Sequence, residues 1–199
     1  MNNWLLNTAE KVMDILKSLP QVNDCKLYGS LANGTYDELS DIDIEIDVSG
    51  YDNGRFMMEL ESLLSDRLNI IFSDYAPSLV PDKYIVSLAI DEDNPFLILD
   101  LYCTAEPHCS TVSKQQAMSA NDFYTHMLKL WVANLKHYFR GQDCYDDIFR
   151  MASKLGISNI DAKNEAELLE CVLIWLENNK TIQTERYILS CRESFENFV

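Results

Sequence analysis

Two aspartates at alternate positions of an apolar segment are the residues in this sequence best suited to chemistry. Asp41 and Asp43 flank Ile42, and the segment continues with Ile, Glu and Asp as far as Val48. Side chains two residues apart in a strand point to the same face, so the two carboxylates share one face. Neighbouring carboxylates repel one another unless a cation lies between them, and Mg²⁺ prefers carboxylate oxygens. The pair predicts one or two Mg²⁺ ions, although the alternation alone also fits a solvated sheet face.

A Gly-Ser pair lies upstream of these aspartates, directly after the strand-like run 25–28. Gly29 would let a phosphate approach the backbone closely. If a short helix opens at Ser30, its free N–H groups and its dipole would favour a phosphate, and the hydroxyl would add a donor. This loop therefore suits a triphosphate, and the strand after it suits the metal that accompanies a triphosphate.

A third carboxylate stands in a nearly continuous apolar run. Asp100 interrupts residues 96–103, a pattern typical of a strand buried on both faces. An unpaired charge in such a strand is costly. Beside Asp41 and Asp43, it would complete a metal site or accept the proton of an attacking hydroxyl. The alternative is a buried aspartate that accepts backbone N–H groups.

The combined pattern, Gly29-Ser30-x3-Gly-x5-Ser40-Asp41-x-Asp43 followed by a later strand with Asp100, resembles the DNA polymerase β-type nucleotidyltransferase superfamily. Small aminoglycoside and lincosamide nucleotidyltransferases share this layout. The resemblance implies that Gly29 and Ser30 hold the triphosphate. It also implies that Ser40 is the small residue that precedes the first metal ligand, and we assign Ser40 to the nucleotide-binding site. It implies that the three aspartates bind metal and are catalytic. Asp100 would be the general base, with Glu106 as an alternative.

The surrounding elements follow from the spacing of apolar residues. Helical patterns cover 1–16 and 55–67, and strand-like runs cover 25–28, 42–48, 68–72, 84–90 and 96–103. A segment rich in Pro, Ser, Thr and Gln covers 107–120, and only helical patterns follow it, at 121–140, 145–155, 163–178 and 182–197. We therefore predict an α/β (α+β) fold. A small mixed β-sheet nucleotidyltransferase domain at 1–110 precedes a C-terminal helical bundle domain at 111–199, with the nucleotide in the cleft between them.

The first long helix of the C-terminal half carries a basic face. No acidic residue occurs between Asp122 and Asp143, and five basic side chains fall within about one 100° arc. Lys129 and Lys136 are the best candidates for contacts with the triphosphate or with leaving pyrophosphate, as a helical-domain lysine does in the family that the motif resembles. A solvated face of an amphipathic helix explains the pattern equally well.

Charge and hydropathy limit the kinds of partner that the protein is expected to bind. The net charge is −16, and residues 1–110 account for −14 of it, with 6 Lys and Arg against 20 Asp and Glu. This balance argues against nucleic acid and favours a cationic small molecule or a metal. No apolar run approaches the ~20 residues of a membrane span, so we predict no membrane association and a cytoplasmic protein. The oligomeric state stays open, with a homodimer as one option.

These observations lead to a metal-dependent nucleotidyltransferase. It would transfer a nucleoside monophosphate, AMP from ATP by default, to a hydroxyl of a small-molecule acceptor and release pyrophosphate. An aminoglycoside- or lincosamide-like antibiotic is the acceptor that the resemblance and the charge favour, with antibiotic resistance as the role. Two alternatives belong to other classes: an antitoxin-type enzyme that adds AMP to a tyrosine of a partner protein, and a non-catalytic nucleotide sensor on the same fold.

Overall fold

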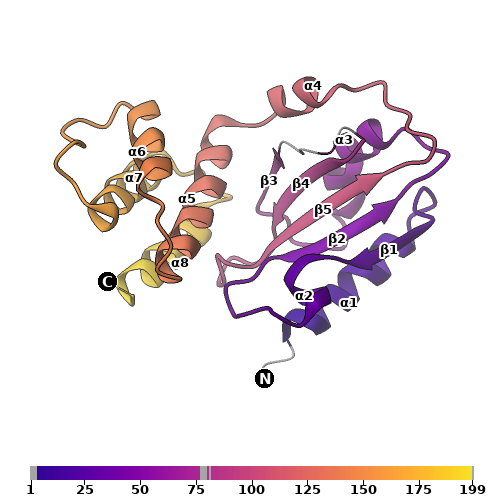
Figure 1. Cartoon of the computed structure of the whole chain (residues 1–199), viewed down its shortest axis with the longest axis horizontal. Coiled ribbons are helices and arrows are strands. Elements are labelled where there is room, and N and C mark those ends of the chain that lie inside the picture. The colour runs from indigo at the N-terminus through magenta and orange to yellow at the C-terminus, as the bar shows by residue number, and fades with distance from the viewer. Residues whose placement is uncertain (1–3, 77–79, 81, 199) are drawn as a thin grey trace. The chain divides into compact units, whose positions relative to one another are not determined.

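The computed structural model describes residues 4–76, 80 and 82–198, and within them the chain forms two compact units. The first unit comprises the residues up to 91 together with 97–121, and the second comprises 92–96 together with 122–199. The chain therefore enters the second unit briefly at 92–96 before it returns to the first. The predicted division into one domain at 1–110 and another at 111–199 stays a prediction. Figure 1 labels the elements.

The first unit is built on a five-stranded mixed sheet, as predicted. Its strand order is β1-β2-β5-β4-β3. The pairing of β2 with β5 is parallel, and the other three pairings are antiparallel. The strand bounds, in the order of the sheet, are β1 Asp24–Leu27, β2 Ile42–Asp47, β5 Ile98–Thr104, β4 Tyr84–Ala89 and β3 Phe72–Ala76. The parallel pair β2 and β5 thus lies inside the sheet and carries two of the candidate aspartates, Asp43 and Asp100, with Asp41 immediately before β2.

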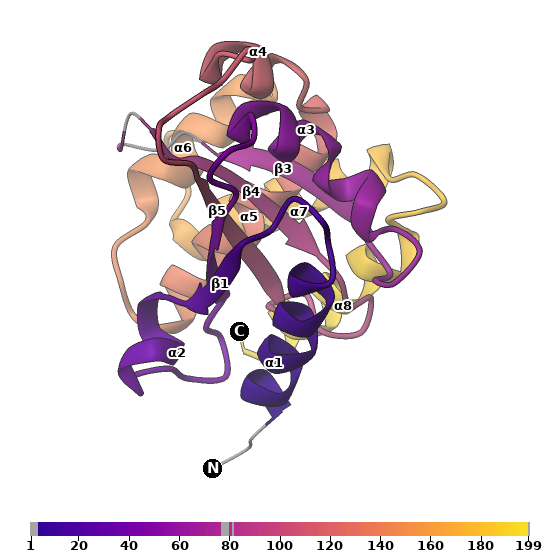
Figure 2. The ribbon, with the colours of Figure 1, turned by 90° about the vertical axis from the view of Figure 1, so that its right-hand side faces the viewer.

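Two helices, α1 (Trp4–Lys17) and α3 (Asn53–Leu64), cover one face of this sheet (Figure 2). The isoleucines of β2 point to this side, as do Leu99, Leu101 and Cys103 of β5, and all of them are buried in one core with the apolar faces of the two helices. Because strand side chains alternate, burying the isoleucines turns the aspartates of β2 to the opposite face. The hydrophobic pattern alone therefore fixes which face bears the carboxylates.

Three local predictions are wrong, each for a physical reason. β3 begins at Phe72 instead of residue 68, because the backbone N–H of Leu68 donates to Leu64 and extends the turn that ends α3. β5 is not buried on both faces, because every second residue from Asp100 to Thr104 is partly exposed. A helix, α4 (Lys114–Ser119), lies in the segment expected to be irregular, where Ser113 and Gln116 form a capping box.

The second unit contains the four predicted helices: α5 Phe123–Phe139, α6 Tyr145–Lys154, α7 Glu165–Asn179 and α8 Glu185–Glu196. Polar N-caps mark two of the starts, since the side chains of Asp122 and Asn164 accept backbone N–H groups of α5 and α7. The indole of Trp131 is fully buried and donates to the carbonyl of Leu169, 3.0 Å away. Residues 92–96 belong here because the Tyr187 hydroxyl donates to the carbonyl of Pro95 at 2.7 Å. None of the described helices has the length and apolar character to cross a bilayer, and the cytoplasmic location stays a prediction.

Arg192 is expected to be the strongest polar contribution to the stability of this unit. From α8 its guanidinium donates to Glu170 at 2.7 Å and to Glu177 at 2.8 Å on α7, and its side chain is only 19% exposed. Arg192→Ala should lower the free energy of unfolding in urea by about 2 kcal/mol, because hydrogen bonds to charged groups are worth more than neutral ones. Arg150→Ala, which removes the exposed pair with Asp147, should cost only about 0.5 kcal/mol. Equal losses in the two variants would contradict this prediction.

The same pair makes stability depend on pH. Hydrogen bonds from Arg192 lower the pKa of Glu177. A carboxyl whose pKa is lowered in the folded state contributes stability above its unfolded pKa of about 4.3 and loses it as the pH falls through the folded value. The difference in unfolding free energy between wild type and Arg192→Ala should therefore be full at pH 7 and shrink below about pH 4.

Candidate active site

The polar face of the sheet brings two of the predicted aspartates to adjacent strands. Asp43 on β2 and Asp100 on β5 are direct register partners in the parallel pair. Asp41 lies immediately before β2 and two residues from Asp43, and all three aspartates are half-buried. Register partners on neighbouring strands project to the same face, so Asp43 and Asp100 lie side by side. The structure therefore brings the predicted carboxylates together on one face of the sheet. Their catalytic roles stay predictions.

A backbone hydrogen bond holds the Gly-Ser loop beside these carboxylates. The N–H of Tyr28 donates to the carbonyl of Asp43 at 2.9 Å, one step beyond the β1–β2 ladder. Gly29 follows with φ 63°, a left-handed conformation that glycine adopts without strain. A Cβ built at Gly29 would lie 2.2 Å from Oδ2 of Asp43. The glycine is therefore required both by its backbone angle and by the close approach of the carboxylate.

A short helix opens at this loop, as the sequence predicted conditionally. α2 spans Gly29–Asn33 and ends at Gly34, whose φ is 69°. No side chain caps its first turn, because the preceding residue is Tyr28 and makes no capping hydrogen bond. The N–H groups of the first turn therefore have no partner inside the helix, and their contact with a phosphate stays a prediction.

Ser40 shapes the loop that leads to the aspartates. Its hydroxyl donates to the carboxylate of Asp37 at 2.8 Å and accepts from the backbone N–H of Asp37 at 2.9 Å. Ser40 is also 8% exposed. These contacts fix the chain immediately before Asp41, which gives Ser40 a structural part in the site. Its contact with nucleotide stays a prediction.

Two hydroxyl groups that the sequence analysis did not single out contact the aspartates. The Tyr102 hydroxyl donates to Oδ1 of Asp43 at 3.3 Å, and the Ser87 hydroxyl donates to Oδ1 of Asp100 at 2.5 Å. Burial, followed by the charges of Asp100 and Asp43, raises the pKa of Tyr102, so its phenol keeps its proton and stays a donor. Tyr102 was within reach of sequence analysis, because it follows Asp100 by two residues. No feature of the sequence around Ser87 indicated a functional role for it.

The donor set fits a hard divalent cation. Among the described residues, no three His, Cys, Asp or Glu side chains are grouped closely enough to enclose a metal ion. Mg²⁺, however, is usually held by one or two carboxylates together with phosphates of the substrate and water. Asp43 and Asp100 in register, with a glycine that leaves the carboxylate uncovered, match that mode of binding.

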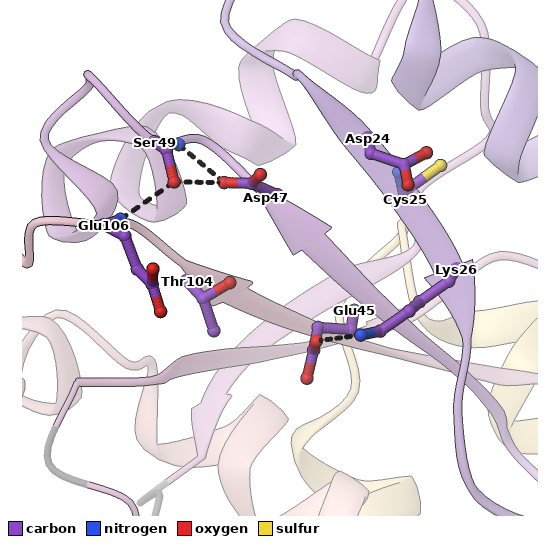
Figure 3. Close-up of a pocket in the computed structure, with 8 residues that line it drawn as sticks. All are labelled: Asp24, Cys25, Lys26, Glu45, Asp47, Ser49, Thr104 and Glu106. Atoms are coloured by element: carbon purple, nitrogen blue, oxygen red, sulfur yellow. Dashed lines mark hydrogen bonds and ion pairs between the residues drawn. The ribbon is translucent and has the colours of Figure 1, made fainter.

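The polar face continues along β2 into a cavity of about 240 Å³ (Figure 3). Four carboxylates and one lysine line it: Asp24, Glu45, Asp47, Glu106 and Lys26. Asp47 accepts the backbone N–H of Ser49 at 2.8 Å and the Ser49 hydroxyl at 2.6 Å, and the Glu106 backbone N–H donates to that hydroxyl. These hydrogen bonds lower the pKa of Asp47, so it stays ionised. The cavity is therefore negatively charged on the side of β2 that carries Asp43.

Glu45, two residues after Asp43 on the same face of β2, is held between two lysines. Its two oxygens contact Lys26, at 2.8 Å, and Lys83, and its side chain is 18% exposed. Hydrogen bonds from the two lysines lower its pKa. The ammonium group of Lys83 also lies 5.5 Å from the ring centroid of Tyr28, next to the Gly-Ser loop. Lys83 thus connects the end of β1 to the cavity, a role that its isolated position in the sequence did not indicate.

The two lysines predicted to contact the triphosphate lie on α5 in the second unit. Lys136 is buried, with 4% of its surface exposed, and Lys129 is partly buried. The alternative of a fully solvated basic face therefore does not hold for Lys136, since a buried ammonium group requires polar partners. Contact of either lysine with nucleotide stays a prediction.

Comparison with known proteins finds a family match within the first unit. Residues 10–83, which include the Gly-Ser loop, Asp41 and Asp43, match the model of the family described as Polymerase beta, Nucleotidyltransferase. No curated protein matches the sequence. A solved structure of a GLD-2/RNP-8 complex is 14% identical, with a TM-score of 0.40, over 100% of this chain and 69% of that one.

Two further solved structures are similar at the same level. The polymerase core of TRAMP, a RNA surveillance complex, is 13% identical with a TM-score of 0.37 over 98% of this chain. The non canonical Poly(A) polymerase complex GLD-2 – GLD-3 is 16% identical with a TM-score of 0.39 over 94% of it. The chain spans 56% of the length of each of these two.

The exclusion of nucleic acid as a partner is wrong. The similar structures include a poly(A) polymerase complex and the polymerase core of an RNA surveillance complex, which conflict with that exclusion. Its physical weakness is that net charge sums the whole surface, whereas nucleic acid responds to local groups of Lys and Arg.

Proposed function

We propose that the chain, whose residues 10–83 match the nucleotidyltransferase family model, transfers a nucleoside monophosphate from a Mg²⁺-bound nucleoside triphosphate to a hydroxyl group. The observation that carries the proposal is the register of Asp43 with Asp100, next to a glycine that leaves the carboxylate uncovered. A nucleotide sensor needs the phosphate-binding loop but has no need of paired carboxylates beside it.

In this mechanism each residue acts on charge or position. Gly29 and Ser30 present backbone N–H groups to the β- and γ-phosphates. Asp41 and Asp43 would hold Mg²⁺, which supplies Lewis-acid neutralisation of the triphosphate when it is bound. Asp100 accepts the proton of the attacking hydroxyl or completes the metal site. The hydroxyl attacks the α-phosphorus in line, the bond to the bridging oxygen breaks, and pyrophosphate leaves with that oxygen.

For the acceptor we propose a small, cationic molecule that bears the hydroxyl, such as an aminoglycoside. The cavity beyond Asp43 supports this choice, because four carboxylates against one lysine line it. A molecule with several separated ammonium groups suits carboxylates that are dispersed along a wall better than a single metal ion does. A hydroxyl at the end of RNA is the competing acceptor.

The proposal is tested by measuring pyrophosphate release with Mg²⁺ and each of the four nucleoside triphosphates. The acceptors are a cationic aminoglycoside, a lincosamide, an RNA oligonucleotide with a free 3′-hydroxyl, and buffer alone. We expect release with the aminoglycoside and none with buffer alone, together with a product heavier by one nucleotide unit. Elongation of the RNA without any release with the aminoglycoside would overturn the proposed acceptor and keep the reaction. Absence of release with every acceptor, combined with no Mg²⁺-dependent shift of thermal unfolding by any triphosphate, would overturn the reaction itself.

A further inference from the structure

Ser87 is a fully buried polar residue in the middle of β4, with 0% of its surface exposed. Its neighbours Val86 and Leu88 are apolar and buried against the helical side of the sheet, so Ser87 points to the polar face. A buried hydroxyl is costly unless it makes a hydrogen bond, and the bond it makes is to Oδ1 of Asp100 at 2.5 Å. The single polar residue at the centre of an apolar strand is thus directed at a candidate catalytic carboxylate.

The sheet registers place this serine in a polar row that crosses four strands. Asp43 pairs with Asp100, Asp100 pairs with Ser87, and Ser87 pairs with Asp74. All four side chains lie on one face, because register partners project to the same side. Ser87 therefore stands between Asp100 and the buried Asp74, where only a small side chain with a donor satisfies the neighbouring carboxylate.

We propose that Ser87 is a positioning residue of the transfer reaction, and this inference rests on the function proposed above. Its hydroxyl holds Oδ1 of Asp100 and so fixes the rotation of the carboxylate. The second oxygen, Oδ2, is then the one presented to the metal or to the acceptor proton. Groups that orient a metal-site ligand through a hydrogen bond typically change metal affinity or activity by about 10–100-fold when they are removed.

The competing explanation is that Ser87 only satisfies its own burial. Val86 separates the two explanations, because it lies next to Ser87 on the same strand, is buried to 2% exposed, and faces the opposite side. Val86→Ala weakens the same strand through the apolar core and leaves the hydrogen bond to Asp100 in place. A purely structural role for Ser87 predicts that Ser87→Ala and Val86→Ala have the same functional effect at matched stability.

The test compares wild type, Ser87→Ala, Ser87→Thr and Val86→Ala in the full chain. Mn²⁺ binding is measured by electron paramagnetic resonance with a non-hydrolysable triphosphate analogue, and kcat is measured by pyrophosphate release. Ser87→Ala should weaken Mn²⁺ binding or lower kcat by at least about tenfold. Ser87→Thr, which keeps the hydroxyl, should recover most of that loss, and Val86→Ala should match wild type in both quantities.

Two results would overturn the inference without touching the reaction: wild-type Mn²⁺ binding and kcat in Ser87→Ala, or equal losses in Ser87→Ala and Val86→Ala. An inactive wild type that binds no Mn²⁺-nucleotide would instead overturn the proposed function and this inference with it. Urea unfolding of each variant identifies any that fails to fold. If Ser87→Ala fails to fold, Ser87→Cys takes its place, because the thiol has similar size and is a weaker donor.

Discussion

Asp43→Asn is expected to abolish nucleotidyl transfer while the protein stays folded. The substitution keeps the shape of the side chain and removes the charge that would hold Mg²⁺ beside the Gly-Ser loop. Charge stabilisation by a divalent cation is worth several kcal/mol, and each 1.4 kcal/mol is a factor of ten, so kcat should fall by about 10³-fold. Asp41→Asn should give a loss of the same order. Pyrophosphate release at saturating triphosphate measures the effect.

The stability of Asp43→Asn should not fall with its activity. Removing one of two neighbouring negative charges relieves repulsion, so the free energy of unfolding in urea should be equal to that of wild type or slightly higher. Asp66→Asn is the matched control, because Asp66 is exposed and lies after α3. It undergoes the same chemical change and should keep wild-type activity. Full activity in Asp41→Asn or Asp43→Asn would refute the assignment of the metal-binding pair.

The second large effect is expected from Gly29→Ala. The new methyl group would lie 2.2 Å from Oδ2 of Asp43, so the carboxylate has to rotate away from its position. Displacing a catalytic group by about 1 Å is enough to cost ~10²-fold in rate. We therefore expect kcat to fall by about 10²-fold and the Mg²⁺ concentration required for half-maximal rate to rise.

Gly34→Ala provides a control matched in backbone angle. Gly34 has φ 69° against 63° for Gly29, but nothing lies within 4 Å of a Cβ at that position. Both variants adopt a left-handed conformation with a side chain, which costs roughly 1–2 kcal/mol, so their unfolding free energies should fall by similar amounts. Only Gly29→Ala should lose most of its activity. Equal activities in the two variants would show that the close approach of residue 29 to Asp43 does not affect activity.

Substitutions at the site can be separated from substitutions in the core because the two sets of residues lie on opposite faces of one sheet. The isoleucines of β2, with Leu99, Leu101 and Cys103 of β5, are buried with the two helices, whereas Asp43 and Asp100 project to the polar face. A substitution on the polar face therefore changes charge and hydrogen bonding with little loss of buried apolar area. For the same reason, Val86→Ala on the apolar face should lower stability without changing the chemistry.

The sequence by itself determined the local parts of this protein. The alternation of isoleucine with acidic residues at 42–47 was enough to predict a strand with one acidic face, because the strand period is two residues. Its spacing from Gly29-Ser30 was enough to predict a phosphate-binding loop, and residues 10–83 match the corresponding family. Helices α5 to α8 were predictable because amphipathic spacing and N-caps are also local.

Tertiary structure decided what depends on pairing between strands distant in sequence. The contact of Asp100 with Ser87, and of Asp43 with Tyr102, arises from registers that join residues 13 and 59 positions apart. The same registers showed that β5 is polar on one face, although its composition is nearly all apolar. They also placed Glu45 between Lys26 and Lys83. Local propensity cannot supply this information, because the partner of a strand residue is set by the global packing of the sheet and not by its own neighbours.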